Sequence, residues 1–132
     1  MPLFTVKRNV STSGIIRVSQ ETALLFLHNM GGMITLNPLV QSYETLPDDP
    51  STFVITDRLK VLFWTTTTKY TARGTTTDDG IIFVVKAGGG MTSTNRWKCS
   101  KRDTEDGSES VEVIEDAIIE VYISHCSGGI RS

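Results

Sequence analysis

The sequence has little cysteine, little net charge and no long apolar run, and each shortage removes a class of function. Only Cys99 and Cys126 are present, and neither stands at a spacing typical of zinc or redox sites. The net charge of -2 leaves no surplus of basic groups to neutralise phosphates, so nucleic acid is not an expected partner. No run of about 18 apolar residues occurs, which predicts no membrane span.

Other missing signals narrow the chemistry and the compartment. The first residues lack the apolar run of a signal peptide, which predicts a soluble, cytoplasmic protein with free thiols. No Ser/His/Asp order, paired histidine ligands, GxGxxG fingerprint or P-loop is present. Covalent hydrolysis, metal chemistry and nucleotide use are therefore disfavoured, and we expect no cofactor.

The residues that are present predict one α+β domain. The chain of 132 residues has the length of a single domain, which we expect over residues 1–124, with residues 125–132 as a flexible tail. Residues 3–11 alternate as a strand does. From Ser19, which can cap a helix, the pattern changes to a helix of about three turns. Gly31-Gly32 is expected to break it, leaving a short bent helix pair.

Strand and turn signals then continue to the end of the domain. The segments are rich in threonine, β-branched and aromatic residues, and they are separated by polar turns. They predict a curved antiparallel sheet of about seven strands, because a sheet of this length must coil to bury its inner face. One short helix pair cannot fill the concave face, which leaves room for a ligand. The expected strands after the helices are residues 39–46, 51–62, 63–77, 81–87, 91–102 and 111–123.

Three segments resemble the START-like helix-grip superfamily: MGGMITLNPLVQSYETLPDDPSTFVITDR, TTTTKYTARGTTTDDGIIFVVKAGG and TNRWKC. The words LNPLV, ITDR, YTAR and NRW are most similar to a group of small fungal proteins, and the resemblance covers residues 3 to 124. This superfamily includes aromatic polyketide cyclases, plant ligand carriers and lipid-transfer domains. The resemblance therefore implies a cavity for a hydrophobic small molecule, held between the sheet and a long C-terminal helix.

The sequence departs from that family pattern at its end. Tyr122-Ile123 is followed by residues rich in serine and glycine, where the family has an amphipathic helix. The pocket is then either open to solvent or covered by a second chain. Alternation also places Ile82 and Val84 on the outer face. An uncovered concave face and an apolar outer stripe together predict a homodimer.

Alternation assigns the candidate ligand-binding residues to the concave face. In the strand of residues 81–87, Phe83 and Val85 point inward. The aromatic and threonine side chains of the preceding strand either line the pocket or only fill the sheet. Asn95 and Trp97 are also expected inward, where an indole can stack on a ligand or pack as core. The candidate ligand-binding residues are Trp64, Thr66, Thr68, Tyr70, Phe83, Val85, Asn95, Trp97 and Tyr122.

Glu115, His28 and Tyr70 are the candidates for catalysis. Glu115 shares a face with inward aliphatic side chains, where desolvation would favour general acid or base work near neutral pH. A bulge that turns Glu115 outward is the alternative. His28 lies near the end of the first helix and serves either the pocket mouth or the helix terminus. The leading hypothesis is a cofactor-independent cyclase or isomerase of natural-product biosynthesis, and the alternative is a carrier of a lipid or pigment.

Overall fold

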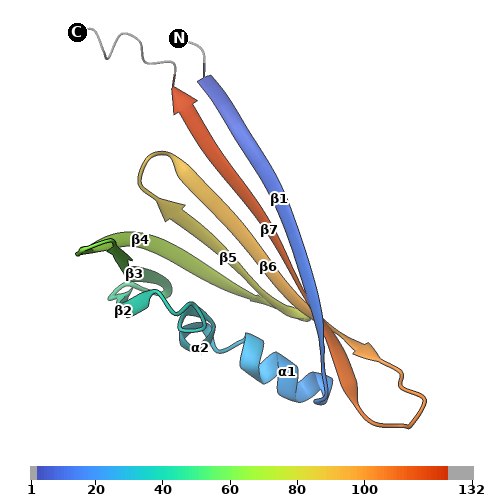
Figure 1. The fold of residues 1–132 in the computed structure, drawn as a ribbon. Coiled ribbons are helices and arrows are strands. Elements are labelled where there is room, and N and C mark those ends of the chain that lie inside the picture. Colours follow the sequence, from blue (N-terminus) through green and yellow to red (C-terminus); the bar gives the residue numbers. More distant parts are fainter. Residues whose placement is uncertain (1–2, 125–132) are drawn as a thin grey trace, which may run out of the picture.

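The computed structural model describes residues 3–124, and the tail expected over residues 125–132 lies outside the described residues. The seven strands form one antiparallel sheet, in the order β1-β7-β6-β5-β4-β3-β2 (Figure 1). This confirms the predicted α+β class. The strands are β1 (Leu3–Ile16), β2 (Val40–Leu46), β3 (Asp49–Val61), β4 (Trp64–Thr77), β5 (Gly80–Ala87), β6 (Met91–Arg102) and β7 (Ser110–Ser124), and the helices between β1 and β2 are α1 (Gln20–Leu27) and α2 (Met30–Ile34).

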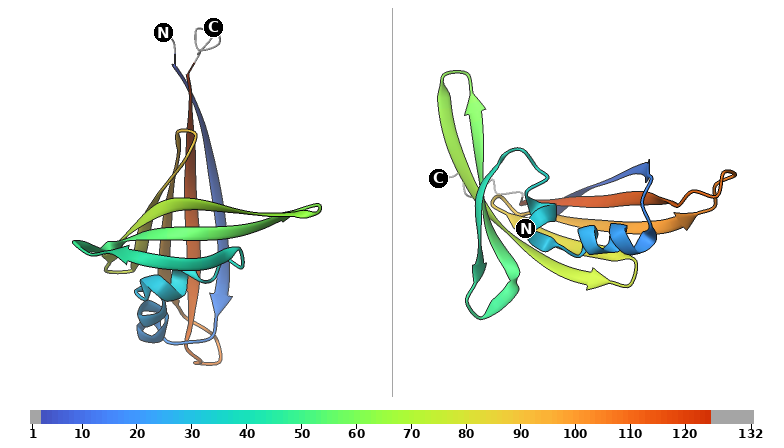
Figure 2. Two further views of the ribbon diagram at one scale, coloured as in Figure 1. Left: turned by 90° about the vertical axis from the view of Figure 1, so that its left-hand side faces the viewer. Right: turned by 90° about the horizontal axis from the view of Figure 1, so that it is seen from below.

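The sheet is strongly coiled. Strands β2 to β7 follow one another as a meander, and β7 pairs with β1 along its length, so the first and last strands are neighbours. In Figure 2, β2, β3 and β4 run across the direction of β1, β6 and β7. A sheet of this length has one concave and one convex face because the twist of each strand accumulates from strand to strand. Both helices lie on the concave side (Figure 1).

The helix pair bends at a different place from the one the sequence suggests. Helix α1 is capped as expected, by Ser19, whose Oγ accepts from the backbone N–H of Thr22 at 3.1 Å. Asn29 caps α2, and Gly31 lies inside that helix. A Cβ at Gly31 would collide with the Tyr43 hydroxyl of β2. The expectation that the glycines break the helix is therefore wrong: Gly31 allows α2 to approach β2 closely.

The core lies where the two helices cover the sheet. Ile81 of β5 and Val111 of β7 are fully buried, and Cys99 is a buried free thiol. Ala23 and Leu27 of α1 belong to the same apolar cluster. Beyond the helices, nothing else in residues 3–124 covers the concave face (Figure 1). Within the same residues, no helix is long and apolar enough to span a membrane.

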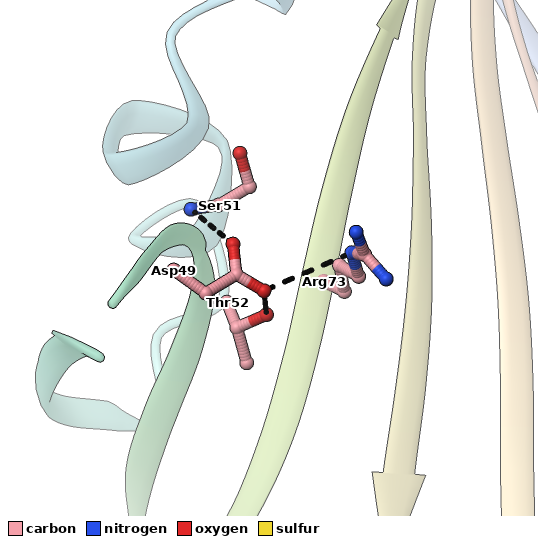
Figure 3. A network of polar contacts seen from close by, with 4 residues as sticks. All are labelled: Asp49, Ser51, Thr52 and Arg73. Atoms are coloured by element: carbon pink, nitrogen blue, oxygen red, sulfur yellow. Dashed lines mark hydrogen bonds and ion pairs between the residues drawn. The ribbon is translucent and has the colours of Figure 1, made fainter. Parts of the chain in front are cut away.

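A polar network fixes the start of β3. The backbone N–H of Ser51 donates to Asp49 Oδ1 at 3.2 Å, and the Thr52 hydroxyl donates to Oδ2 at 2.6 Å (Figure 3). Arg73 Nε of β4 lies 4.0 Å from the same Oδ2. The Thr52 hydrogen bond, together with the Ser51 N–H and the Arg73 charge, lowers the pKa of Asp49. These contacts belong to the β2–β3 turn and serve the fold rather than a ligand.

Candidate functional site

Two adjoining hollows lie on the concave face, and we call them together the concave cleft. The larger has a volume of about 740 Å³ and lies over β3 to β6, and the smaller, of about 340 Å³, lies between α2 and the sheet. Tyr70, Val85 and Asn95 line both, so the two hollows are neighbours. The lining also includes Asp57, Thr68, Met91 and Ser93 in the larger hollow, and Met33, Ile34, Ile55, Phe83, Trp97 and Glu115 in the smaller one.

Strand register brings these side chains together. On β5, Ile81 and Phe83 are buried and Val85 lines the cleft, as their alternation predicts. Phe83 lies opposite Asn95, and Val85 lies opposite Ser93. Because paired residues of antiparallel strands point to the same face, β5 forms an apolar floor with polar side chains beside it on β6.

The first polar group in the cleft is a hydrogen-bonded pair from β3 and β4. The Tyr70 hydroxyl donates to Asp57 Oδ1 at 3.0 Å, and Asp57 is only 9% exposed. Desolvation by burial, then the bond to the Asp57 carboxylate, raises the pKa of Tyr70 to about 12. The hydroxyl therefore stays protonated at neutral pH. Since its hydrogen is directed to Asp57, the pair offers oxygen acceptors to a hydroxyl of a ligand.

The second polar group is a row of three hydrogen-bonded side chains from β6 and β7. Ser93 Oγ donates to Asn95 Oδ1 at 2.8 Å, and Asn95 Nδ2 donates to Glu115 Oε2 at 3.1 Å. The pairing of β1 with β7 continues unbroken through Thr12 opposite Glu115. The bulge considered as an alternative is therefore wrong, and Glu115 points into the concave cleft. The Asn95 amide fixes the orientation of its carboxylate.

Most of the residues expected from the sequence meet in the cleft. Tyr70 and Glu115 come from strands on opposite sides of the β5 floor. No group of three or more metal-ligating side chains occurs among residues 3–124. The arrangement is thus an apolar hollow with one acceptor pair and one oriented carboxylate. The expected residues that line it are Thr68, Tyr70, Phe83, Val85, Asn95, Trp97 and Glu115.

Trp64 and Thr66 do not reach the cleft. They have the same alternation as Tyr70, but β4 pairs with β5 only from Thr71 onward. Trp64 lies at the far end of the β3–β4 hairpin and is 68% exposed. Alternation therefore predicted the face correctly, but it does not report how far along the strand the pocket extends.

His28 and Tyr122 also lie outside the cleft. His28 Nε2 donates to the Thr77 carbonyl oxygen at 2.9 Å, which ties the end of α1 to the end of β4. Tyr122 alternates with Val121, whose partner Met91 lines the cleft, so the Tyr122 side chain belongs to the convex face. Neither residue is placed to act on a ligand in the concave cleft.

Sequence reasoning missed Asp57 and the contribution of α2. Asp57 stands two residues after Ile55 on β3, so alternation puts it on the same buried face. Asp57 was not among the residues expected in the cleft. Met33 and Ile34 of α2 were not expected there either, and only the packing of α2 over the sheet shows that they line the smaller hollow.

Solved structures with the same fold include two cyclases. The Zhui aromatase/cyclase from Streptomyces sp. R1128 has a TM-score of 0.67 at 13% identity, covering 94% of this chain and 73% of its own. DR_A0006 from Deinococcus radiodurans has a TM-score of 0.56 at 18% identity, covering 83% and 81%. The di-domain ARO/CYC BexL from the BE-7585A biosynthetic pathway has a TM-score of 0.52 at 11% identity, covering 86% and 36%.

These likenesses establish a helix-grip-like fold of the polyketide cyclase type, in agreement with the fold expected from the sequence. At identities of 11% to 18%, the similarity shows that the fold is shared but does not show that the activity is shared. No curated protein matches the chain in sequence. A family model does match, over residues 15–124, which is most of the chain and includes every residue of the concave cleft. The chain therefore belongs to the family described as Domain of unknown function (DUF7053).

Proposed function

We propose that the protein binds an apolar, carbonyl-bearing small molecule in the concave cleft and promotes its cyclisation or isomerisation without a cofactor. The observation that carries the proposal is the arrangement of the cleft. The Asp57–Tyr70 acceptor pair and the Glu115 carboxylate lie across an apolar floor from one another. The fold shared with two aromatase/cyclases supports the same reaction class.

The cleft suits a folded, flexible chain with several carbonyl groups. The apolar floor would hold such a chain in a bent conformer, which lowers the barrier because rotation about the bonds of the chain is restricted before the reaction. An enolic hydroxyl of the ligand would donate to the Asp57–Tyr70 pair. Glu115 would take a proton from a carbon between two carbonyls, that carbon would add to a carbonyl of the same chain, and the resulting alkoxide would take the proton back. The product is a ring with unchanged composition.

Replacing Glu115 by glutamine tests this role. The amide keeps the size of the side chain but cannot accept the proton, so we expect cyclisation of a linear poly-β-ketone to slow by about 100-fold or more. Binding should persist, because the apolar floor is unchanged. The matched control is Glu112→Gln on the same strand, whose side chain alternates to the convex face. Equal rates for wild type and Glu115→Gln would remove Glu115 from the mechanism.

A non-catalytic carrier of a lipid or pigment is the second candidate. The observation that favours it is the predominantly apolar cleft, because binding alone requires no proton transfer. Wild-type protein that binds the poly-β-ketone but returns it unchanged would support the carrier.

The placement in natural-product biosynthesis and the membership of a group of small fungal proteins stay predictions.

We also propose that the protein forms a homodimer, either through the open concave face or through an apolar stripe on the convex face. Ile82 and Val84 are half-buried and form that stripe, so their substitution tests the convex interface. We expect light scattering of wild type at micromolar concentration to give twice 14.5 kDa. Ile82→Lys and Val84→Lys should return the mass to that of one chain. A mass near 14.5 kDa for wild type would end the dimer proposal.

A further inference from the structure

The end of the β3–β4 hairpin stands apart from the rest of the sheet, and we call residues 58–69 the hairpin tip. Strand β2 pairs with β3 only as far as Asp57, and β5 pairs with β4 only from Thr71. Beyond the bond from the Arg58 N–H to the Leu39 carbonyl oxygen, at 2.8 Å, β3 and β4 pair there only with one another. Figure 2 shows this green two-stranded ribbon projecting beyond the other strands. The tip therefore has no core of its own in which to bury apolar side chains.

Three large apolar side chains nevertheless occupy its end. The exposed fractions are 77% for Leu62, 94% for Phe63 and 68% for Trp64. Leu62 has a φ of 54°, a turn conformation that glycine or asparagine adopts with less strain. Leu62 therefore does not suit the backbone geometry of the turn, and all three side chains are apolar but exposed to water. They bury little surface within this chain, which indicates that they contact a binding partner.

The charges of the tip are all of one sign. Arg58, Lys60 and Lys69 lie within it, and no aspartate or glutamate does, although the whole chain carries a net charge of -2. Lys60 pairs with Thr65 and Arg58 with Thr67, so alternation places the three cations on one face. The opposite face carries Trp64 and Thr66. A basic face behind an apolar end complements an anionic surface with an apolar interior.

We propose that the hairpin tip docks on a lipid bilayer that carries anionic lipids. Leu62, Phe63 and Trp64 enter the boundary between headgroups and acyl chains, where amphipathic indole rings are favoured. The three cations remain at the headgroup level and contact anionic lipids. A stable protein complex buries about 1,000 Å² or more over its two partners, whereas a bilayer closes around a small protrusion such as the three apolar side chains at this turn.

Docking would place the concave cleft beside the bilayer. Thr68 of the tip also lines the larger hollow. An apolar ligand could then pass between membrane and cleft along the hairpin, whether the cleft converts the ligand or only carries it. The docking surface itself rests on the tip alone and does not depend on the proposed reaction.

Vesicle co-sedimentation tests the proposal. Wild-type protein should bind vesicles of phosphatidylcholine mixed with phosphatidylserine more strongly than vesicles of phosphatidylcholine alone. The double variant Phe63→Ser/Trp64→Ser should weaken partitioning at least about tenfold. Lys60→Gln should weaken it about fivefold on the mixed vesicles only. Matched controls are Leu25→Ser on α1, where the leucine is 70% exposed, and Lys101→Gln at the end of β6.

Tryptophan emission gives a second readout. The chain has two tryptophans, so Trp97→Phe leaves Trp64 as the only reporter, and its emission should shift to the blue on mixed vesicles. Unchanged emission, or equal sedimentation of wild type and Phe63→Ser/Trp64→Ser, would overturn the proposal. A third result would also overturn it: wild type does not bind vesicles, and light scattering gives a lower mass for Phe63→Ser than for wild type. The tip would then be a contact between two copies of the chain.

Discussion

Replacing Ile81 by alanine is expected to lower the free energy of unfolding by about 2 to 5 kcal/mol, the range for removing a large aliphatic side chain from a packed core. Ile81 is 0% exposed and belongs to the cluster in which α1 packs on the sheet. Its neighbours are held by strand pairing and cannot collapse fully into the space. Because a small domain is stable by only about 5 to 15 kcal/mol, this loss should be plain in urea unfolding.

The matched control is the adjacent residue of the same strand. Ile82 has the same size, but it is half-buried on the convex face. Ile82→Ala should therefore cost less than half as much as Ile81→Ala, since fewer packed atoms lose contacts. Equal losses at the two positions would mean that the convex face is as tightly packed as the core, and the assignment of inner and outer faces would be wrong.

Replacing Val85 by tryptophan is expected to weaken ligand binding at least about tenfold, because the larger side chain fills space that the ligand needs. Val85 lies on the β5 floor and lines both hollows, so one substitution narrows both of them. Anthraquinone, an apolar aromatic diketone, is a suitable probe, and titration calorimetry gives its affinity. Urea unfolding of the variant shows whether the added volume has disturbed the fold.

Val84→Trp separates obstruction from general damage. Val84 precedes Val85 on β5 and points to the convex face, opposite Arg73 and Thr94. The same bulky side chain placed there should leave the affinity for anthraquinone unchanged. If Val84→Trp and Val85→Trp weakened binding equally, the ligand would not occupy the concave face.

The fold could be read largely from the sequence because its signals are local. Alternation identified the buried face of β5, and polar turns such as Asp78-Asp79-Gly80 marked the strand ends. The first strand was predicted too short, since Ser13-Gly14 suggested a turn. Gly14 instead pairs with Val113, and β1 continues to Ile16. Partner strands decide whether a glycine ends a strand, and a single sequence does not show them.

The site could be read only in part because depth and distant contacts are not local. Trp64 and Tyr70 share one alternation pattern, yet only Tyr70 lies where neighbouring strands form a hollow. Asp57 was missed because its partner is separated from it by 13 residues and a hairpin turn. The Asn95–Glu115 bond likewise depends on the register of β6 and β7. Strand pairing, rather than residue type, assembles the cleft.

Contact quenching of Trp97 by anthraquinone is the most direct test of a ligand site in the concave cleft. Trp97 lines the smaller hollow, whereas Trp64 lies at the exposed hairpin tip, so each single-tryptophan variant reports one location. In Trp64→Phe, which retains Trp97, we predict saturable quenching with the affinity measured by calorimetry. In Trp97→Phe we predict only the weak, linear quenching of a surface indole. Saturable quenching of Trp64 with none of Trp97 would contradict the account and place the ligand outside the concave cleft.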